Sequence, residues 1–173
     1  KETLEKHLFY NHLSSLMNLY PMKDRVILGN SWAIDMRCIN SESIVNKVLN
    51  KELLVVIVPH QLDTKNIEEM KKELSLYPIV HILTSDQNDF TSFINNVKQN
   101  PGPIFVVLKG VLLELYQGFG TSYVGGGFGR SVHSLLEPFC AGSHVVSGNK
   151  VHRSTEYDFI ISTEHGPKGG DEI

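Results

Sequence analysis

The residues with the clearest chemical potential lie in a glycine-rich turn in the C-terminal third of the chain. Gly125, Gly126, Gly127 and Gly129 follow a short apolar run and precede a stretch with helical periodicity. Glycines let the backbone pass close to a ligand, and the free N–H groups at a helix start suit a phosphate. The pattern is neither a dinucleotide fingerprint, because position 130 is Arg, nor a P-loop. A structural strand-to-helix loop is the alternative interpretation.

A carboxylate follows this turn at Glu137, and its residue type permits two roles. It can accept both hydroxyls of a ribose through charge-assisted hydrogen bonds. Alternatively, Ser134 and Glu137 have the spacing of a capping box, in which Glu137 only reaches back to the start of its own helix. Pro138 comes directly afterwards and predicts a distorted first helical turn.

Basic and imidazole side chains surround the same segment. Between residues 115 and 155 Glu137 is the only acid, and it is accompanied by Arg130, Lys150 and Arg153. This basic balance within an acidic chain favours an anionic ligand there. His60 and His133 could each donate to a phosphate, act as a base or ligate a metal. The histidines show no HExxH or paired spacing, so we expect no metal site and no cofactor.

Composition limits the remaining possibilities. The chain has 173 residues, 41% of them hydrophobic and 20% charged, which predicts a single globular domain over residues 1–173. A net charge of -3 gives no general attraction to nucleic acid. The only cysteines, Cys38 and Cys140, lie in no metal or disulfide pattern, which fits a reducing cytoplasm. No apolar run is long enough to span a bilayer, and the opening residues already have helical spacing, so we expect a fragment of a longer protein.

The elements that must position these residues alternate between strands and helices. Apolar runs predict strands at residues 25–29, 53–58, 79–83, 104–108, 122–124 and 144–146. Helical periodicity predicts helices near residues 4–20, 39–49, 64–74, 89–97, 111–116 and 133–140. We expect caps at Asp63 or Thr64 and at Asp89, and a helix stop at Gly142. This alternation predicts an α/β fold with a parallel sheet and helices on both faces.

Taken together, these segments resemble the C-terminal half of Kdo transferases, the GT-B glycosyltransferases that transfer 3-deoxy-D-manno-octulosonic acid from CMP-Kdo to a lipid A precursor. Residues 123–138 resemble the family's Val-Gly-Gly-Ser/Gly turn followed by His-Asn-x-Leu-Glu-Pro. Residues 26–32, 56–60 and 145–149 resemble its first two strand ends and a later glycine turn. The chain departs from the pattern at Asn30, Ser134 and Asn149.

The resemblance implies a Rossmann-like nucleotide-sugar-binding domain, with roles for particular residues. The amides of Gly125, Gly126 and Gly127 and the helix starting near His133 would hold the CMP phosphate, with Arg130 beside it. Glu137 would take the ribose, and Ser31 and His60 would line the cytidine side. Ser134, at the position of the family's Asn, is a further expected nucleotide- or phosphate-binding residue.

The resemblance also implies what lies elsewhere in such a protein. The catalytic carboxylate, the acceptor site for the lipid A precursor and the membrane anchor belong to an N-terminal half, so no catalytic residue is expected in this chain. The full protein would be an inverting, metal-independent enzyme at the cytoplasmic face of the bacterial inner membrane. The alternatives are a GT-B transferase with a UDP or GDP donor, and a non-catalytic nucleotide- or partner-binding α/β module.

Overall fold

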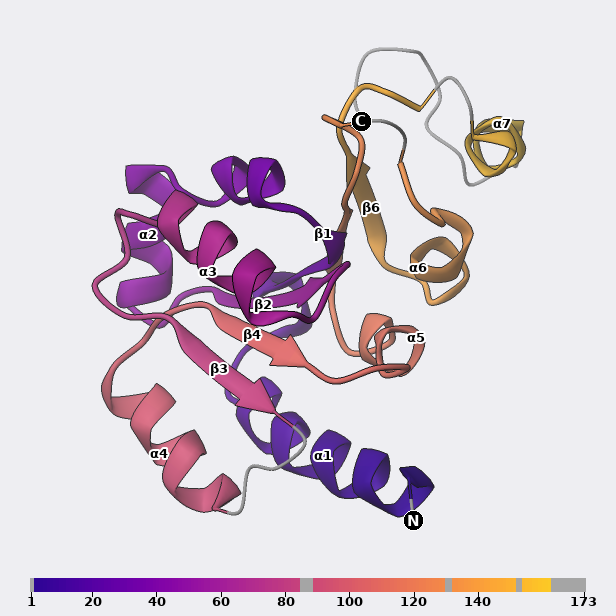
Figure 1. The fold of residues 1–173 in the computed structure, drawn as a ribbon. Coiled ribbons are helices and arrows are strands. Elements are labelled where there is room, and N and C mark those ends of the chain that lie inside the picture. Colours follow the sequence, from indigo (N-terminus) through magenta and orange to yellow (C-terminus); the bar gives the residue numbers. More distant parts are fainter. Residues whose placement is uncertain (1, 85–88, 130–131, 152–153, 163–173) are drawn as a thin grey trace.

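The chain builds a six-stranded sheet in which every neighbouring pair of strands is parallel (Figure 1). The computed structural model describes residues 2–84, 89–129, 132–151 and 154–162, with side chains from Phe9 onward. The strand order is β3-β4-β2-β1-β5-β6. The strands are β1 (Arg25–Ser31), β2 (Leu54–Pro59), β3 (His81–Thr84), β4 (Ile104–Val107), β5 (Thr121–Val124) and β6 (His144–Ser147).

Helices cover both faces of this sheet. One face packs against α1 (Glu2–Met17), α4 (Phe90–Gln99) and α5 (Leu112–Tyr116), and the other against the 3-10 helix η2 (Ala33–Cys38), α2 (Glu42–Leu49) and α3 (Thr64–Glu73). A short 3-10 helix, η1 (Met22–Asp24), precedes β1, and α6 (Leu136–Cys140) and α7 (Thr155–Ser162) follow β5 and β6. The predicted Rossmann-like α/β class is therefore confirmed.

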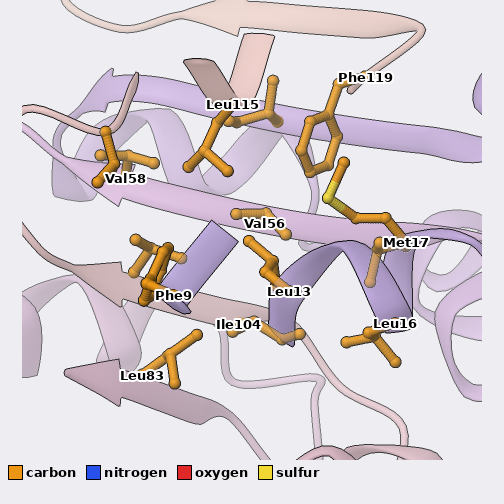
Figure 2. Close-up of a cluster of buried hydrophobic side chains, with 14 of the residues drawn as sticks. Phe9, Leu13, Leu16, Met17, Val56, Val58, Leu83, Ile104, Leu115 and Phe119 are labelled. Atoms are coloured by element: carbon orange, nitrogen blue, oxygen red, sulfur yellow. The ribbon is translucent and has the colours of Figure 1, made fainter. Parts of the chain in front are cut away.

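The central strand β2 explains why a continuous apolar run is needed here. Side chains alternate across a strand, and Val56 and Val58 enter the core on the α1 face, while Val55 and Ile57 enter the core on the α3 face. Figure 2 shows the first of these cores, where Leu13 of α1 lies against the sheet. Each face thus buries its own hydrophobic cluster, and the strand ends are held in fixed positions.

Several predicted helix boundaries are confirmed. Asp63 caps α3 by accepting a hydrogen bond from Asn66 N at 3.0 Å, and Asp89 caps α4 by accepting one from Ser92 N at 2.9 Å. Gly142 ends α6 with a φ of 78° and donates from its N–H to Phe139 O at 3.0 Å.

At the C-terminal side one predicted helix starts later than expected, and one helix was missed. The helix expected over residues 133–140 begins only at Leu136, because His133 N donates to Gly125 O at 3.2 Å and keeps its residue in the turn. The helix α7 was not predicted at all. A signal was present, since Ser154 Oγ accepts a hydrogen bond from Tyr157 N at 3.2 Å in the manner of a helix cap.

The buried hydroxyl of Tyr116, which packs beside β1, affects the stability of the protein. Its hydroxyl is fully buried and, among the described residues, is the side-chain polar atom left without a hydrogen-bond partner. It also occupies the space beside Gly29, where an added Cβ would lie 2.0 Å from the hydroxyl oxygen. Glycine at position 29 is therefore required by the tyrosine that packs against β1.

We predict that Tyr116→Phe raises the free energy of unfolding by roughly 1 kcal/mol, because it removes an unsatisfied buried hydroxyl. Gly29→Ala should cost about 1–3 kcal/mol through overpacking, and less in the Tyr116→Phe background. Urea denaturation of the four proteins checks both points. A destabilised Tyr116→Phe protein would show instead that the hydroxyl has a partner such as a bound water.

Candidate functional site

The candidate site lies at the carboxyl edge of the sheet, where β1 and β5 are neighbours. The chain leaves β1 toward β2 and leaves β5 toward β6, so the two connections diverge from adjacent strands. Open parallel sheets bind ligands at such topological switch points. We use the name switch-point loops for the irregular end of β1 with the residue after it (residues 30–32, called the loop after β1), residue 60 after β2 and residues 125–129 after β5.

The exit from β1 has an irregular backbone that brings these loops together. The register between β1 and β2 shifts between Gly29 and Ser31, and Asn30 has a φ of 50°. Asparagine tolerates this left-handed conformation better than most residues, which explains how it replaces the glycine usual in the resembled pattern. His60 N then donates to Ser31 O at 3.0 Å, so the loops after β1 and β2 are tied.

The glycine turn after β5 packs against the loop after β1. Gly125 N donates to Gly29 O at 2.9 Å, and an added Cβ at Gly125 would lie 2.3 Å from Asn30 O. Gly126 has a φ of 92°, which only glycine adopts at little cost. The absence of side chains at these positions therefore serves contact within the protein.

A second glycine contact joins the turn to the loop after β6. A Cβ added to Gly127 would lie 2.6 Å from Gly148 N, and one added to Gly148 would lie 2.5 Å from Gly127 C. Lys150 N donates to Gly127 O at 3.0 Å, and its Nζ donates to Gly129 O at 2.8 Å. The later glycine turn of the resembled pattern thus supports the first one.

Asp35 is the buried acid of the site. It is fully buried in η2, and its carboxylate accepts hydrogen bonds from Tyr123 Oη at 2.6 Å, Trp32 N at 2.8 Å and Gly126 N at 3.3 Å. Burial, with further effects of Asp35 and Cys38, raises the pKa of Tyr123, which keeps the hydroxyl proton available to the carboxylate. One side chain thereby connects β5, the glycine turn and the exit of β1.

Three aromatic rings meet beside Asp35. They belong to Trp32 and His60 of the switch-point loops and to His133, which follows the glycine turn. His60 stacks on His133 with ring centroids 4.3 Å apart, and Trp32 lies against His60 at 4.7 Å. Trp32 Nε1 donates to His133 Nε2 at 3.3 Å. Burial and the charge of His60 lower the pKa of His133 from 6.5, and the charge of Asp35 opposes this shift. We call Trp32, His60 and His133 the ring cluster.

The predicted site residues are therefore only partly brought together. His60 and His133 are in contact, and the three glycines form the adjoining turn. Ser31 is fully buried, and its Oγ lies 3.4 Å from Val58 O and 3.5 Å from Leu28 O, so its side chain faces the strand ends. The predicted Arg130 lies outside the described residues, as does Arg153.

Glu137 does not form the capping box with Ser134. The start of α6 is capped by Glu156 of α7, whose Oε2 accepts from Leu135 N at 2.6 Å and Leu136 N at 3.1 Å. Ser134 Oγ also donates to Glu156, at 3.3 Å. Glu137 is exposed, and its charge adds to the effect of burial in raising the pKa of Tyr116. The ribose-binding role of Glu137 stays a prediction.

Sequence reasoning missed Asp35, Glu156 and the half-buried Trp32 as residues of the site. The Asp35 signal was its position three residues after Trp32, the spacing by which an acid accepts from the residue before a helix. Glu156 carried no such signal, because its partners lie about twenty residues earlier in the chain.

The described residues provide neither a cluster of metal ligands nor a membrane-spanning helix. Within the described part of the chain, no group of three or more His, Cys, Asp or Glu side chains is arranged to hold a metal ion. The helices described for this chain are all too short or too polar to cross a bilayer.

Comparison with known proteins supports the architecture. No protein-family model matches the chain, and no curated protein sequence matches it. Its structure is similar to the crystal structure of the C-terminal CMP-Kdo binding domain of WaaA from Acinetobacter baumannii, with a TM-score of 0.56 and 15% sequence identity. The match covers 83% of this chain and 72% of that one. At this identity the likeness establishes a shared fold, the fold that the motifs had predicted.

We predict that Gly125→Ala destabilises the protein by about 1–3 kcal/mol or more, because the new Cβ meets the backbone of the loop after β1. Gly129→Ala is the matched control. Among the described residues its Cβ would meet only Gly126 O, at 3.5 Å, an ordinary contact, so the stability of the variant should stay within about 0.5 kcal/mol of wild type. Equal losses in thermal or urea denaturation would contradict the packing role of Gly125.

We further predict that Asp35→Asn costs about 1.5–3 kcal/mol, because an amide cannot accept all three hydrogen bonds of the carboxylate. Asp63→Asn provides the control, since asparagine is an equally good helix cap. Urea denaturation measures both, and a neutral Asp35→Asn would remove Asp35 from its organising role.

Proposed function

We propose that this chain is the CMP-Kdo-binding domain of a glycosyltransferase that transfers Kdo to a lipid A precursor in lipopolysaccharide biosynthesis. The observation that carries the proposal is the meeting of the glycine turn with His60 and His133 at the switch point of the sheet. The solved domain that shares this fold is itself named for binding CMP-Kdo. The family motifs in residues 123–138 support the same assignment.

The donor phosphate is proposed to bind over the glycine turn beside the ring cluster. The N–H groups of Gly125 and Gly126 already donate to Gly29 O and Asp35, whereas within the described residues Gly127 N has no acceptor. The amides at the start of α6 are bonded to Glu156. We therefore place the phosphate at Gly127 and the two imidazoles, and not at the helix start that the resemblance implied.

The nucleoside is proposed to extend from this phosphate toward Glu137 and His60. Glu137 is exposed and free of the predicted capping bond, so its carboxylate is available for the ribose hydroxyls. His60 is exposed at the end of β2 and is held by the carbonyl of Ser31. Ser31 thus supports the cytidine side by positioning His60, while its own hydroxyl faces the strand ends.

The mechanistic contribution of such a domain is electrostatic. Departure of CMP leaves negative charge on its phosphate, and hydrogen-bond donors already aimed at that position stabilise the transition state. Gly127 N, the imidazoles and the basic residues Arg130 and Lys150 are proposed to supply this stabilisation without a metal. The base that activates the acceptor, the lipid A precursor site and the membrane anchor are proposed to lie in an N-terminal half, at the cytoplasmic face of the inner membrane.

The test is binding of CMP to the chain, measured by isothermal titration calorimetry. We expect Glu137→Gln to weaken CMP binding by about 1.5–3 kcal/mol, roughly tenfold to a hundredfold, with little change in stability. Glu52→Gln is the control, because Glu52 is an exposed acid preceding β2, at the opposite edge of the sheet. UMP and GMP titrated in parallel distinguish a cytidine donor from a uridine or guanosine donor.

A double cycle with 2′-deoxy and 3′-deoxy CMP locates Glu137 relative to the ribose. Wild type should lose affinity for these analogues, and Glu137→Gln should lose little more, because the coupled groups are then already absent. Additive losses would show that Glu137 does not touch the ribose. Absence of binding by any of the nucleotides would favour a partner-binding module instead.

A further inference from the structure

The hydrogen bond between Trp32 and His133 determines the protonation state of His133. An indole Nε1–H is a donor only, so the His133 Nε2 that faces it at 3.3 Å must carry a lone pair. His133 is therefore neutral in this arrangement, with its proton on Nδ1. If the ring took up a second proton, on Nε2, the N–H of His133 would point at the N–H of Trp32 and the hydrogen bond would break.

The groups around His133 have opposing effects on whether its imidazole is neutral or protonated. His60 stacks directly on the His133 ring from the loop after β2, so protonating both rings costs repulsion. Asp35 lies on the η2 side and attracts a proton to His133, while burial opposes one. The other ionisable groups described there, Tyr123 and Cys38, interact with Asp35. A nearby anion is the element that would shift this balance toward the charged imidazole.

We propose that the ring cluster is a proton-linked phosphate-binding element, in which His133 takes up a proton as a phosphate binds and thereby releases Trp32. The proton comes from solvent and forms the Nε2–H bond of His133, and no other covalent bond of the protein changes. This inference rests on the proposed function, because the phosphate is the one carried by the nucleotide donor. The new element is that the site recognises the charge of the phosphate and that Trp32 responds when the phosphate binds.

The physical reason is the cost of placing a dianion beside neutral rings. A phosphate monoester with its second pKa near 6 is almost fully dianionic at about pH 7.5. A protonated imidazole offers it a charge-assisted hydrogen bond, which is roughly twice as strong as a neutral one. His60 is exposed beside the stack and can donate to the same phosphate. A neutral nucleoside offers no such charge and should leave the Trp32–His133 bond intact.

Calorimetry in buffers of different ionisation enthalpy tests the proton linkage. At about pH 7.5 we expect uptake of up to roughly one proton per CMP or inorganic phosphate bound, and none with cytidine.

Trp32 is the only tryptophan, so its fluorescence reports the cluster directly, and a protonated imidazole quenches a neighbouring indole. CMP should quench it and cytidine should not.

Variants identify the group that takes up the proton. His133→Gln can still accept from Trp32 but cannot titrate, so uptake and quenching should both disappear. His144→Gln is the control, because His144 is an exposed histidine at the start of β6, at the opposite edge of the sheet. Trp32→Phe removes the donor that holds His133 neutral, and His133 should then titrate at higher pH by NMR. Uptake retained in His133→Gln would overturn the assignment.

The outcomes separate this inference from the proposed function. CMP binding without proton uptake by wild type would overturn the linkage and leave the nucleotide site standing. Uptake and quenching by inorganic phosphate, with CMP binding no more tightly, would support the phosphate element and remove the nucleotide function. Failure of both CMP and inorganic phosphate to bind at about pH 6 and pH 8 would remove both. If His133→Gln does not fold, the wild-type uptake and the Trp32→Phe titration still decide the question.

Discussion

The buried carboxylate of Asp35 is the interaction on which the geometry of the site depends. A buried charge is tolerated only when its oxygens are satisfied, and here the donors come from three places: Tyr123 of β5, Gly126 of the turn and Trp32 after β1. Because the donors belong to segments that diverge from adjacent strands, the carboxylate can be satisfied only when those segments are correctly placed. The cost of leaving it unsatisfied therefore stabilises one arrangement of the loops.

The glycines act together with this carboxylate. Gly125 and Gly127 approach the backbones of the loops after β1 and β6 too closely for any side chain, and the left-handed Gly126 turns its N–H toward Asp35. Their first role is thus to bring backbone against backbone. Any ligand-binding role follows from the surface that this packing creates, which is why the motif can persist although two of its three amides are already bonded.

The sequence was sufficient for features that local chemistry determines. The unbroken apolar run of β2, the cap at Asp63 and the stop at Gly142 depend on residues within a few positions, and all three were predicted. The helix α7 was missed although its cap at Ser154 is local. The start of α6 was not predicted, because Glu156 caps it from about twenty residues later in the chain. The same limit applies to the site: His60 and His133 were candidates, but their stacking depends on the order of the strands.

The charges around the ring cluster explain why a basic, glycine-rich segment can pack against the buried acid Asp35. Burial and His60 lower the pKa of His133, and the charge of Asp35, whose carboxylate is satisfied by three donors, opposes that shift. Without that carboxylate, burial and the neighbouring imidazole would make protonation of His133 still harder. The carboxylate of Asp35 therefore favours the proton uptake by His133 that we propose to accompany phosphate binding.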